Sequence, residues 1–516
     1  MNQRAGELLQ SAVRHHQSGQ LQSAEKLYNE VLSQFPGSPE AHCNLGILLH
    51  GTGNLETAAE HLQRAVVLNP NLAPAWNNLG VVLRKLHRVP EAVRALSRAL
   101  QISPQSSGAH HNLALLYIEE SDFEPALHHA LKATELAPGD PSIAVTVGDV
   151  LLQLNRPKDA VSFLQQLARK FPDHPGPYNG LGMAFLACNE LADAELNYRR
   201  VLEFDPDLVE AHFCLGVIQL LRGDLQLGLP DYEWRLQRPQ NSKIVLKQAG
   251  APWTGQELKD RTIQVFTEQG FGDVIQAARY LPMLKPGRLV LRVPQPLQRL
   301  LATMEIKMEI TGPEAIVQGV DFNVSIMSLA HRLGTTLTDI PEGTGYLKPP
   351  IERIMEFNTF LGTKDKPRVG ICWRGNPRHA HDRKRSIPVS TLDGLIDNSR
   401  VEWINLQVPS TPEDRAFLPD RHGLGKELGD FLDTACLIKN LDLVVTVDTS
   451  VAHLAGALGV PTFVLLPFAP DWRWMLERSD SPWYPTIRLF RQDRPGAWDS
   501  AVNAVACAIE EKFDFS

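Results

Sequence analysis

Residues 37–70 have the sequence GSPEAHCNLGILLHGTGNLETAAEHLQRAVVLNP, and residues 71–104 have the sequence NLAPAWNNLGVVLRKLHRVPEAVRALSRALQISP. The two stretches agree at three kinds of position, and the spacing of 34 residues continues over the first half of the chain. The repeating positions are the prolines Pro36, Pro70, Pro104, Pro138, Pro172 and Pro206, the alanines Ala24, Ala58, Ala92, Ala126, Ala160 and Ala194, and the small residues Gly46, Gly80, Ala114, Gly148, Gly182 and Gly216. Small side chains let two helices approach closely and proline ends a helix, so the period predicts stacked helix–turn–helix units.

The period and its pattern resemble the tetratricopeptide-repeat (TPR) family over about residues 4–238, with six full units and a degenerate seventh. The seventh contains Asp231-Tyr232-Glu233-Trp234-Arg235, which we expect to cap the solenoid against the next domain.

TPR arrays bind polypeptides in a concave groove. Asn44, Asn78 and Asn112 recur where the family faces that groove, and the arrangement is similar to the asparagine ladder of the nucleocytoplasmic O-GlcNAc transferase. An amide can both donate to and accept from a peptide backbone, so these residues are candidates for binding an acceptor peptide. The alternative is that asparagine is common at this position whatever the repeats bind.

The composition is that of a folded protein, with 43% hydrophobic and 21% charged residues among 516. A net charge of −8 disfavours a sequence-independent nucleic-acid binder. The six cysteines are scattered, without a Cys-x-x-Cys pair, which predicts free thiols rather than a zinc or disulfide framework. The start of the chain has no apolar signal segment, and the apolar stretch 441–468 is interrupted by Asp442, Asp448 and Pro461. We therefore expect no transmembrane segment and a cytoplasmic location.

The second half of the chain alternates short apolar runs with amphipathic stretches, which predicts an α/β region. The expected strands are 262–267, 288–293, 368–373, 403–406, 441–447 and 461–466, and the expected helices are 274–284 and 451–458. The predicted organisation is an all-α TPR solenoid over 1–238, a linker over 239–261, and two Rossmann-like lobes over 262–349 and 350–516. Ligands of such sheets bind at the carboxyl ends of strands, so residues that directly follow a strand are the site candidates.

Two of these strands lead into a polar turn that opens a helix. The first turn is Gly270-Phe271-Gly272-Asp273, whose glycines allow a ligand to approach the backbone while the helix start favours negative charge. The alternative is that Asp273 simply caps the helix. The second turn is Asp448-Thr449-Ser450-Val451-Ala452-His453, whose hydroxyls, N–H groups and imidazole are candidates for holding a diphosphate. The alternative here is a helix cap with a helix-facing histidine.

A loop dense in cations follows the strand 368–373, and a phosphate-bearing ligand needs such cations. It contains Trp373-Arg374-Gly375-Asn376-Pro377-Arg378 and Asp382-Arg383-Lys384-Arg385-Ser386, so Arg374 and Arg385 are candidates, with Gln407 after the next strand. The alternative is a solvated run of charges. Two aromatic segments, 470–474 and 481–485, could stack on a base or a sugar, or could fix the C-terminal fold.

Gly272-Asp273, Arg385-Ser386-Ile387-Pro388 and the run 448–459 together resemble the lipopolysaccharide heptosyltransferases of glycosyltransferase family 9, over about residues 262–512. The resemblance implies a GT-B fold, with Asp273 as the catalytic base. It implies that Asp448, Thr449, Ser450 and His453 hold the donor diphosphate, and that Arg385 stands where the family has a phosphate-neutralising lysine.

The implied reaction is an inverting sugar transfer from a UDP- or ADP-linked donor, without a metal or other cofactor. The one Asp-x-Asp, Asp205-Pro206-Asp207, lies at a repeat boundary, which disfavours a metal-dependent transferase. Three hypotheses follow: transfer to a protein Ser or Thr presented by the TPR groove, transfer to a lipid-linked or surface glycan, and a non-catalytic scaffold. The joint presence of Asp273, Arg385 and His453 favours an enzyme over the scaffold.

Overall fold

The computed structural model describes residues 3–341, 343–376, 382–408, 411–419, 424 and 427–515. The chain divides into two compact units, residues 1–184 and 185–516. Among the described residues, every helix is too short or too polar to traverse a bilayer.

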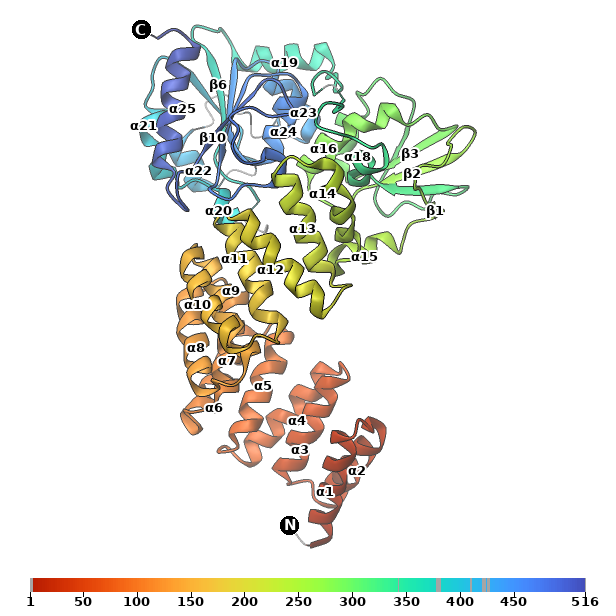
Figure 1. The fold of residues 1–516 in the computed structure, drawn as a ribbon, viewed down its shortest axis with the longest axis vertical. Helices are drawn as coiled ribbons and strands as arrows, with labels where there is room; N and C mark the ends of the chain where they lie inside the picture. Colours follow the sequence, from red (N-terminus) through yellow and green to blue (C-terminus); the bar gives the residue numbers. More distant parts are fainter. Residues whose placement is uncertain are drawn as a thin grey trace. The chain divides into compact units, whose positions relative to one another are not determined.

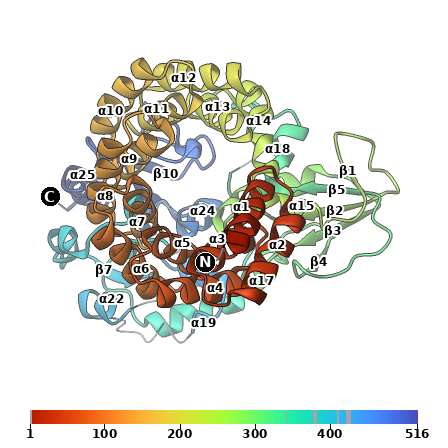
Figure 2. The same cartoon turned by 90° about the horizontal axis from the view of Figure 1, so that it is seen from below.

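The first unit consists of antiparallel helix pairs that follow one another along a curve (Figures 1 and 2). Its helices are α1 (Gln3–Gln17), α2 (Leu21–Gln34), α3 (Pro39–Gly51), α4 (Leu55–Leu68), α5 (Ala73–Lys85), α6 (Val89–Ile102), α7 (Ser107–Glu119), α8 (Phe123–Leu136), α9 (Pro141–Gln153) and α10 (Pro157–Lys170), while α11 (Pro175–Ala187) continues into the second unit.

The repeat positions lie where the two helices of a pair touch. The alanines of this unit at these positions are all fully buried. A Cβ added to Gly46 would lie 2.6 Å from Leu62 Cγ, and one added to Gly80 would lie 2.5 Å from Leu96 Cγ. Each second helix ends two residues before the repeat proline, as α2 does before Pro36, because proline disfavours helical conformation in the residue that precedes it. The predicted helix–turn–helix period is confirmed.

The odd-numbered helices α1, α3, α5, α7 and α9 contact each other from one repeat to the next, whereas the even-numbered helices are less closely packed on one another. The odd-numbered helices therefore form the inner side of the curve (Figure 2). Asn44, Asn78 and Asn112 lie on α3, α5 and α7, and all three are half-buried.

The second unit begins with the last helices of the repeat array: α12 (Leu191–Phe204), α13 (Val209–Leu221), α14 (Leu225–Tyr232) and the 3-10 turn η1 (Glu233–Gln237). Leu220, Leu225, Leu229 and Tyr232 belong to the same hydrophobic core as the two α/β lobes. The last repeat is therefore part of the α/β body rather than a separate segment of the solenoid.

The N-terminal lobe contains a five-stranded, fully parallel sheet in the order β1-β5-β2-β3-β4. Its strands are β1 (Ala251–Pro252), β2 (Thr262–Phe266), β3 (Arg288–Arg292), β4 (Glu309–Thr311) and β5 (Phe322–Ser325). Its helices are α15 (Pro239–Val245), α16 (Phe271–Ala277), η2 (Ala278–Met283), α17 (Gln295–Leu301), η3 (Ile326–Ser328) and α18 (Leu329–Arg332). The next helix, α19 (Ile351–Leu361), packs on α23 (Phe431–Ile438) of the C-terminal lobe. The range 239–261, predicted as a linker, contains α15 and the edge strand β1.

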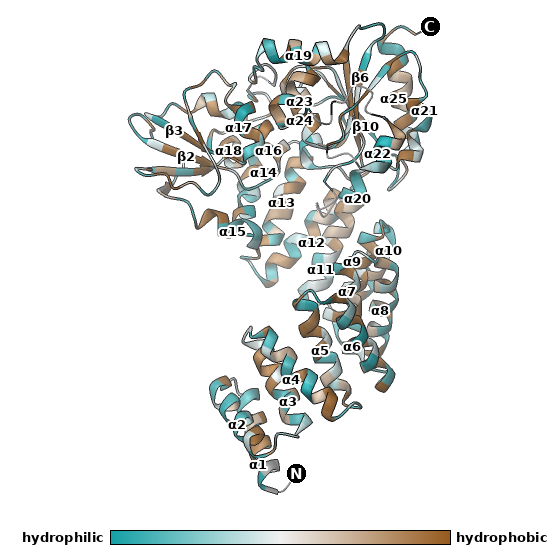
Figure 3. Cartoon of the chain, turned by 180° about the vertical axis from the view of Figure 1, so that it is seen from behind, coloured by the Kyte–Doolittle hydropathy of each residue, from teal (hydrophilic) through white to brown (hydrophobic). Residues whose placement is uncertain are grey.

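The C-terminal lobe contains a second five-stranded parallel sheet in the order β10-β9-β8-β6-β7. Its strands are β6 (Arg368–Cys372), β7 (Glu402–Asn405), β8 (Leu443–Val447), β9 (Thr462–Leu466) and β10 (Ile487–Arg491), and Figure 3 shows the hydropathy of the residues in this lobe. Its helices are α20 (Asp382–Arg385), η4 (Val389–Thr391), α21 (Asp393–Ile396), α22 (Pro412–Phe417), α23 (Phe431–Ile438), α24 (Ser450–Ala457), η6 (Trp472–Trp474) and α25 (Asp499–Lys512).

Both sheets reverse their strand order once, and ligands of open parallel sheets bind at such a switch point. In the C-terminal lobe the reversal lies between β6 and β8, which end at Cys372 and Val447. In the N-terminal lobe it lies between β2 and β5. The two predicted motifs, at 270–273 and 448–453, directly follow β2 and β8.

Candidate active site

The start of α16, from the N-terminal lobe, packs against the start of α24, from the C-terminal lobe. A Cβ added to Gly272 would lie 2.7 Å from His453 Cδ2 and 3.3 Å from Ser450 Cα. Only glycine fits at this distance, so the absence of a side chain at position 272 permits the contact. The two motifs that the sequence predicted are therefore neighbours.

Asp273 is held by two partners at this junction. Its Oδ2 accepts a hydrogen bond from the Gly270 N–H at 2.8 Å, which caps α16. Its Oδ1 lies 2.7 Å from Arg473 Nη2, and about a quarter of its side chain is exposed (23%). The capping alternative is thus observed, and the helix begins at Phe271, three residues before the predicted start at Val274. Capping leaves the carboxylate available to a second partner.

Arg473 is a site residue that the sequence did not single out. It lies in η6 with 3% of its surface exposed, and its guanidinium contacts Asp273, Asp471 and Gln276. Burial disfavours the cation, but the charges of Asp273 and Asp471 hold the pKa of Arg473 well above its ordinary value. The residue therefore joins the two lobes as a permanent cation. Its one sequence signal is an arginine between Trp472 and Trp474.

His453 is buried and neutral. Its Nδ1 lies 3.2 Å from the Tyr484 hydroxyl, and its ring stacks on Trp474 with centroids 5.3 Å apart. Burial and the positive charge of Arg473 lower the pKa of His453 to about 3. At neutral pH the imidazole can donate one hydrogen bond to a ligand, but it brings no positive charge.

Asp448 and Arg385 meet at the carboxyl end of β8. Arg385 Nη1 donates to the Asp448 backbone oxygen at 3.0 Å, and Arg385 Nε donates to Asp382 at 3.2 Å. Burial and the negative charge of Asp471 raise the pKa of the Asp448 carboxyl. Arg385 therefore lies beside the start of α24.

Thr449 and Ser450 have different surroundings. The Thr449 hydroxyl accepts from the Val451 N–H at 3.3 Å and lies 3.1 Å from the Thr446 hydroxyl, so it caps α24 on the side of the sheet. Ser450 is the first residue of α24, is half-buried and lies next to Gly272. Ser450 therefore lies at the junction of the lobes, whereas the Thr449 hydroxyl is directed to the sheet.

Arg374 and Gln407 form a neighbouring group at the ends of β6 and β7. The Arg374 guanidinium binds both carboxylate oxygens of Asp414 in α22, with Nε to Oδ1 at 3.1 Å. Gln407 Oε1 accepts the Arg374 backbone N–H at 3.1 Å. The predicted donor cation Arg374 is therefore paired with Asp414, whereas Arg385 contacts Asp448. Pro377 and Arg378 of the same loop lie outside the described residues.

A buried ion pair lies under the loop that carries Gly270 and Asp273. Arg235 of η1 and Glu268, which follows β2, are 3.0 Å apart and almost completely buried. Glu268 also accepts from the Ser325 hydroxyl at 2.6 Å, and the Tyr232 hydroxyl donates to Gln269 at 3.2 Å. The segment 231–235 therefore anchors the loop before Gly270, and it occupies the switch point between β2 and β5.

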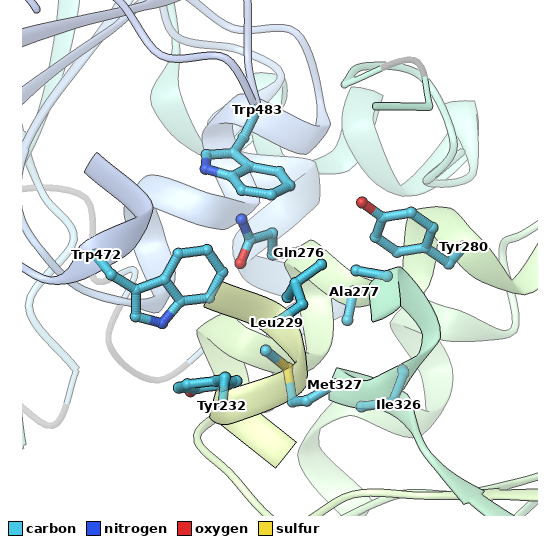
Figure 4. Close-up of a pocket in the computed structure, with 10 residues that line it drawn as sticks. Leu229, Tyr232, Gln276, Ala277, Tyr280, Ile326, Met327, Trp472 and Trp483 are labelled. Atoms are coloured by element: carbon cyan, nitrogen blue, oxygen red, sulfur yellow. The ribbon is translucent and has the colours of Figure 1, made fainter. Parts of the chain in front are cut away.

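An apolar pocket lies where α14, the N-terminal lobe and the C-terminal lobe meet (Figure 4). Leu229 and Tyr232 line it from α14, Gln276 and Ala277 from α16, and Trp472 and Trp483 from the C-terminal lobe. Its volume of about 20 Å³ is close to the minimum for one water molecule. The pocket is thus a packing void between the three elements rather than a substrate site.

The predicted peptide-binding asparagines belong to the first unit. Asn78 Nδ2 donates to the Pro74 carbonyl at 2.8 Å, within its own helix. Asn112 Nδ2 donates to Asn77 Oδ1 of the preceding repeat at 2.9 Å. The side-chain amides of Asn78 and Asn112 therefore have different hydrogen-bond partners, and the asparagines do not repeat one hydrogen-bonding pattern.

Comparison with known proteins agrees with the repeat assignment. Models of the tetratricopeptide repeat match residues 15–80, 71–139 and 111–175. Protein FlbA of Caulobacter vibrioides is 27% identical over 398 residues, which are 71% of this chain and 66% of FlbA. The matched region thus spans just under two thirds of FlbA.

Solved structures that this chain resembles include a tetratricopeptide repeat protein from Parabacteroides merdae, with a TM-score of 0.41, 16% identity, and coverage of 48% of this chain and 97% of that one. PilF of Pseudomonas aeruginosa has a TM-score of 0.35 and 18% identity, and the match covers 41% of this chain and 97% of PilF. The N-terminal region of this chain is a tetratricopeptide-repeat solenoid, and a region of parallel sheets and helices follows it.

Proposed function

We propose that the second unit is an inverting, metal-independent glycosyltransferase of GT-B fold that uses a nucleotide-diphosphate sugar. The observation that carries the proposal is the contact between Gly272 and His453. This contact brings the Asp273 carboxylate, which follows β2 of the N-terminal sheet, beside the polar start of α24, which follows β8 of the C-terminal sheet. Ligands of parallel sheets bind at the carboxyl ends of the strands. In the proposal, the acceptor binds at the strand ends of the N-terminal sheet and the donor binds at those of the C-terminal sheet.

In this mechanism Asp273 accepts the proton of the acceptor hydroxyl as that oxygen attacks the anomeric carbon. The bond to the diphosphate breaks, and its developing negative charge is met by the start of α24, the Ser450 hydroxyl and Arg385. Arg473 lies 2.7 Å from Asp273 and holds the carboxylate in place at the junction of the lobes. Neutral His453 can donate to a phosphate oxygen through Nε2, because Nδ1 lies against Tyr484.

The acceptor in the favoured form of the proposal is a protein Ser or Thr, delivered by a polypeptide bound to the TPR helices near Asn44, Asn78 and Asn112. The donor is UDP- or ADP-linked. Transfer to a lipid-linked or surface glycan is the alternative enzyme. A non-catalytic scaffold is the second candidate function, and one observation favours it: Asp273 caps a helix and pairs with Arg473, as a purely structural residue would.

The test is nucleotide release from UDP-, ADP- and GDP-sugars by the full chain, with intact mass of candidate protein acceptors as the second readout. Asp273→Asn retains a capping side chain, and it is expected to lower turnover by about 10²- to 10⁴-fold, the usual contribution of a general base. The matched control is Asp365→Asn, which changes an exposed aspartate between α19 and β6 and leaves turnover unchanged.

Turnover that is equal in wild type and Asp273→Asn would contradict the assigned base. Absence of turnover with every donor would favour the scaffold. A mass increase on a glycan acceptor, but on no protein, would select the alternative enzyme. Melting temperatures of both variants separate loss of chemistry from loss of fold.

A further inference from the structure

One face of the N-terminal sheet carries an unexpected row of polar side chains. Gln264 of β2 is in register with Asn323 of β5, and Arg292 of β3 is in register with Thr311 of β4. Gln264 and Arg292 lie on the same face, because Gln264 pairs with Val290 and alternate residues of a strand share a face. Parallel strands are normally runs of Val, Ile and Leu. The polar row therefore needs an explanation.

A cavity of about 120 Å³ opens at the carboxyl ends of these strands. Phe266 and Thr267 line it from the end of β2, Arg292 from the end of β3, and Glu314 from the segment after β4, while Gln248 closes it from the chain after α15. Its volume is several times the roughly 10–15 Å³ that one water requires. Carboxyl ends of parallel strands are where such sheets bind ligands.

Arg292 is the buried charge that lines this cavity. The residue has 7% of its surface exposed. Nη1 donates to Gln248 Oε1 at 2.7 Å and Nη2 donates to the Pro313 carbonyl, but the buried Nε has no hydrogen-bond partner. Among the described residues, no carboxylate lies within ion-pair distance of this guanidinium. The buried Thr311 hydroxyl beside it also lacks a partner.

The other two charged residues that line the cavity, Lys247 and Glu314, neutralise each other. Lys247 and Glu314 lie 3.5 Å apart, and both are largely exposed. Burial lowers the pKa of Arg292, and Glu314 offsets only part of that effect. A buried cation without a counter-ion is costly, so an anion bound in the cavity would stabilise Arg292. The position of Gln248 is fixed independently, because its Oε1 also accepts from Gln264 at 2.9 Å.

We propose that this cavity binds a small oxyanion, a carboxylate or a phosphate group, held by Arg292. The planar guanidinium matches the paired oxygens of either group. The site does not depend on the transferase proposal, because anion binding requires no turnover.

The test uses the full chain at constant ionic strength, with inorganic phosphate and acetate as the two probes and chloride as the reference anion. Calorimetric titration measures affinity, and thermal melting measures stabilisation. Phosphate, acetate or both are expected to raise the melting temperature of wild type above its value in chloride. A response to phosphate alone identifies a phosphate site, and a response to acetate alone identifies a carboxylate site.

Arg292→Met is expected to weaken this binding about tenfold or more, which corresponds to the loss of one charged hydrogen bond. Arg292→Lys retains the positive charge but lacks the planar guanidinium. It is the second variant to measure if Arg292→Met does not fold. Arg288→Met is the matched control, because Arg288 lies at the opposite end of β3, where it pairs with Glu309, and this variant retains wild-type binding. If neither anion binds wild type more tightly than it binds Arg292→Met or Arg292→Lys, the proposal is overturned.

Discussion

Asp273 and Arg473 form the ion pair on which the proposed chemistry depends. In the pair, a guanidinium nitrogen lies 2.7 Å from the carboxylate that is proposed to accept the proton. Asp471, which also contacts Arg473 at 2.9 Å, can hold the guanidinium when Asp273 is protonated.

A residue-scale prediction concerns His110 and His129 of the first unit, whose Nδ1 atoms are 2.9 Å apart. Burial and the neighbouring His110 lower the pKa of His129 from 6.5 to about 4. Between these values the unfolded chain binds a proton that the folded unit excludes, so the free energy of unfolding falls as the pH falls through this window. Melting followed by circular dichroism should therefore shift to lower temperature between about pH 6.5 and about pH 4.

His129→Asn is expected to reduce this pH dependence. His87→Asn changes an exposed histidine in the turn between α5 and α6, and it is expected to keep the wild-type slope. Identical slopes for wild type and both variants would show that His129 does not carry the effect.

At the scale of elements, the contact between α16 and α24 depends on Gly272. Gly272→Ala would bring a methyl group to 2.7 Å from His453 Cδ2 and 3.3 Å from the Ser450 backbone. The helices must separate, and we expect a loss of about 1–3 kcal/mol in the stability of the second unit, as for other overpacked contacts. Gly394→Ala in α21 meets no atom within 4 Å, and we expect it to be neutral or to stabilise by about 0.4–1 kcal/mol. Urea denaturation curves of both variants measure the difference, and equal midpoints would refute the close contact.

At the scale of the whole molecule, the end of the repeat array belongs to the α/β body. A chain of residues 239–516, cut at the predicted linker, would leave Glu268 buried without Arg235. It would also expose the core that Leu220, Leu229 and Tyr232 complete. Removing one partner of a buried ion pair typically costs about 3–5 kcal/mol, so we expect this chain to be insoluble or to lack a cooperative melt.

A chain of residues 185–516 keeps both features and is expected to melt cooperatively. Gel filtration and circular dichroism compare the two. A stable, cooperative fold of residues 239–516 would show that the helices of the last repeat are dispensable.

Much of the fold could be predicted from residue spacing. The period of 34 predicted the stacked helix–turn–helix units, because proline and small residues act locally or between adjacent helices. Six strands of the lobes were expected close to their observed bounds, since they are continuous apolar runs. Strands β1, β4, β5 and β10 were not expected. β1, β4 and β5 have two, three and four residues, and Arg488 and Arg491 interrupt the apolar residues of β10. None of the four strands is a long apolar run.

The sequence by itself determined the repeat solenoid, the α/β character of the second half and the two polar turns, because each is encoded within a few tens of neighbouring residues. Only the tertiary structure decided what those turns touch. Arg473, Arg235 and Arg292 take their roles from partners distant in the chain, such as Asp273, Glu268 and Gln248, at separations of 200, 33 and 44 residues. A charge far from its partner in sequence carries no local pattern, and only folding brings the two together.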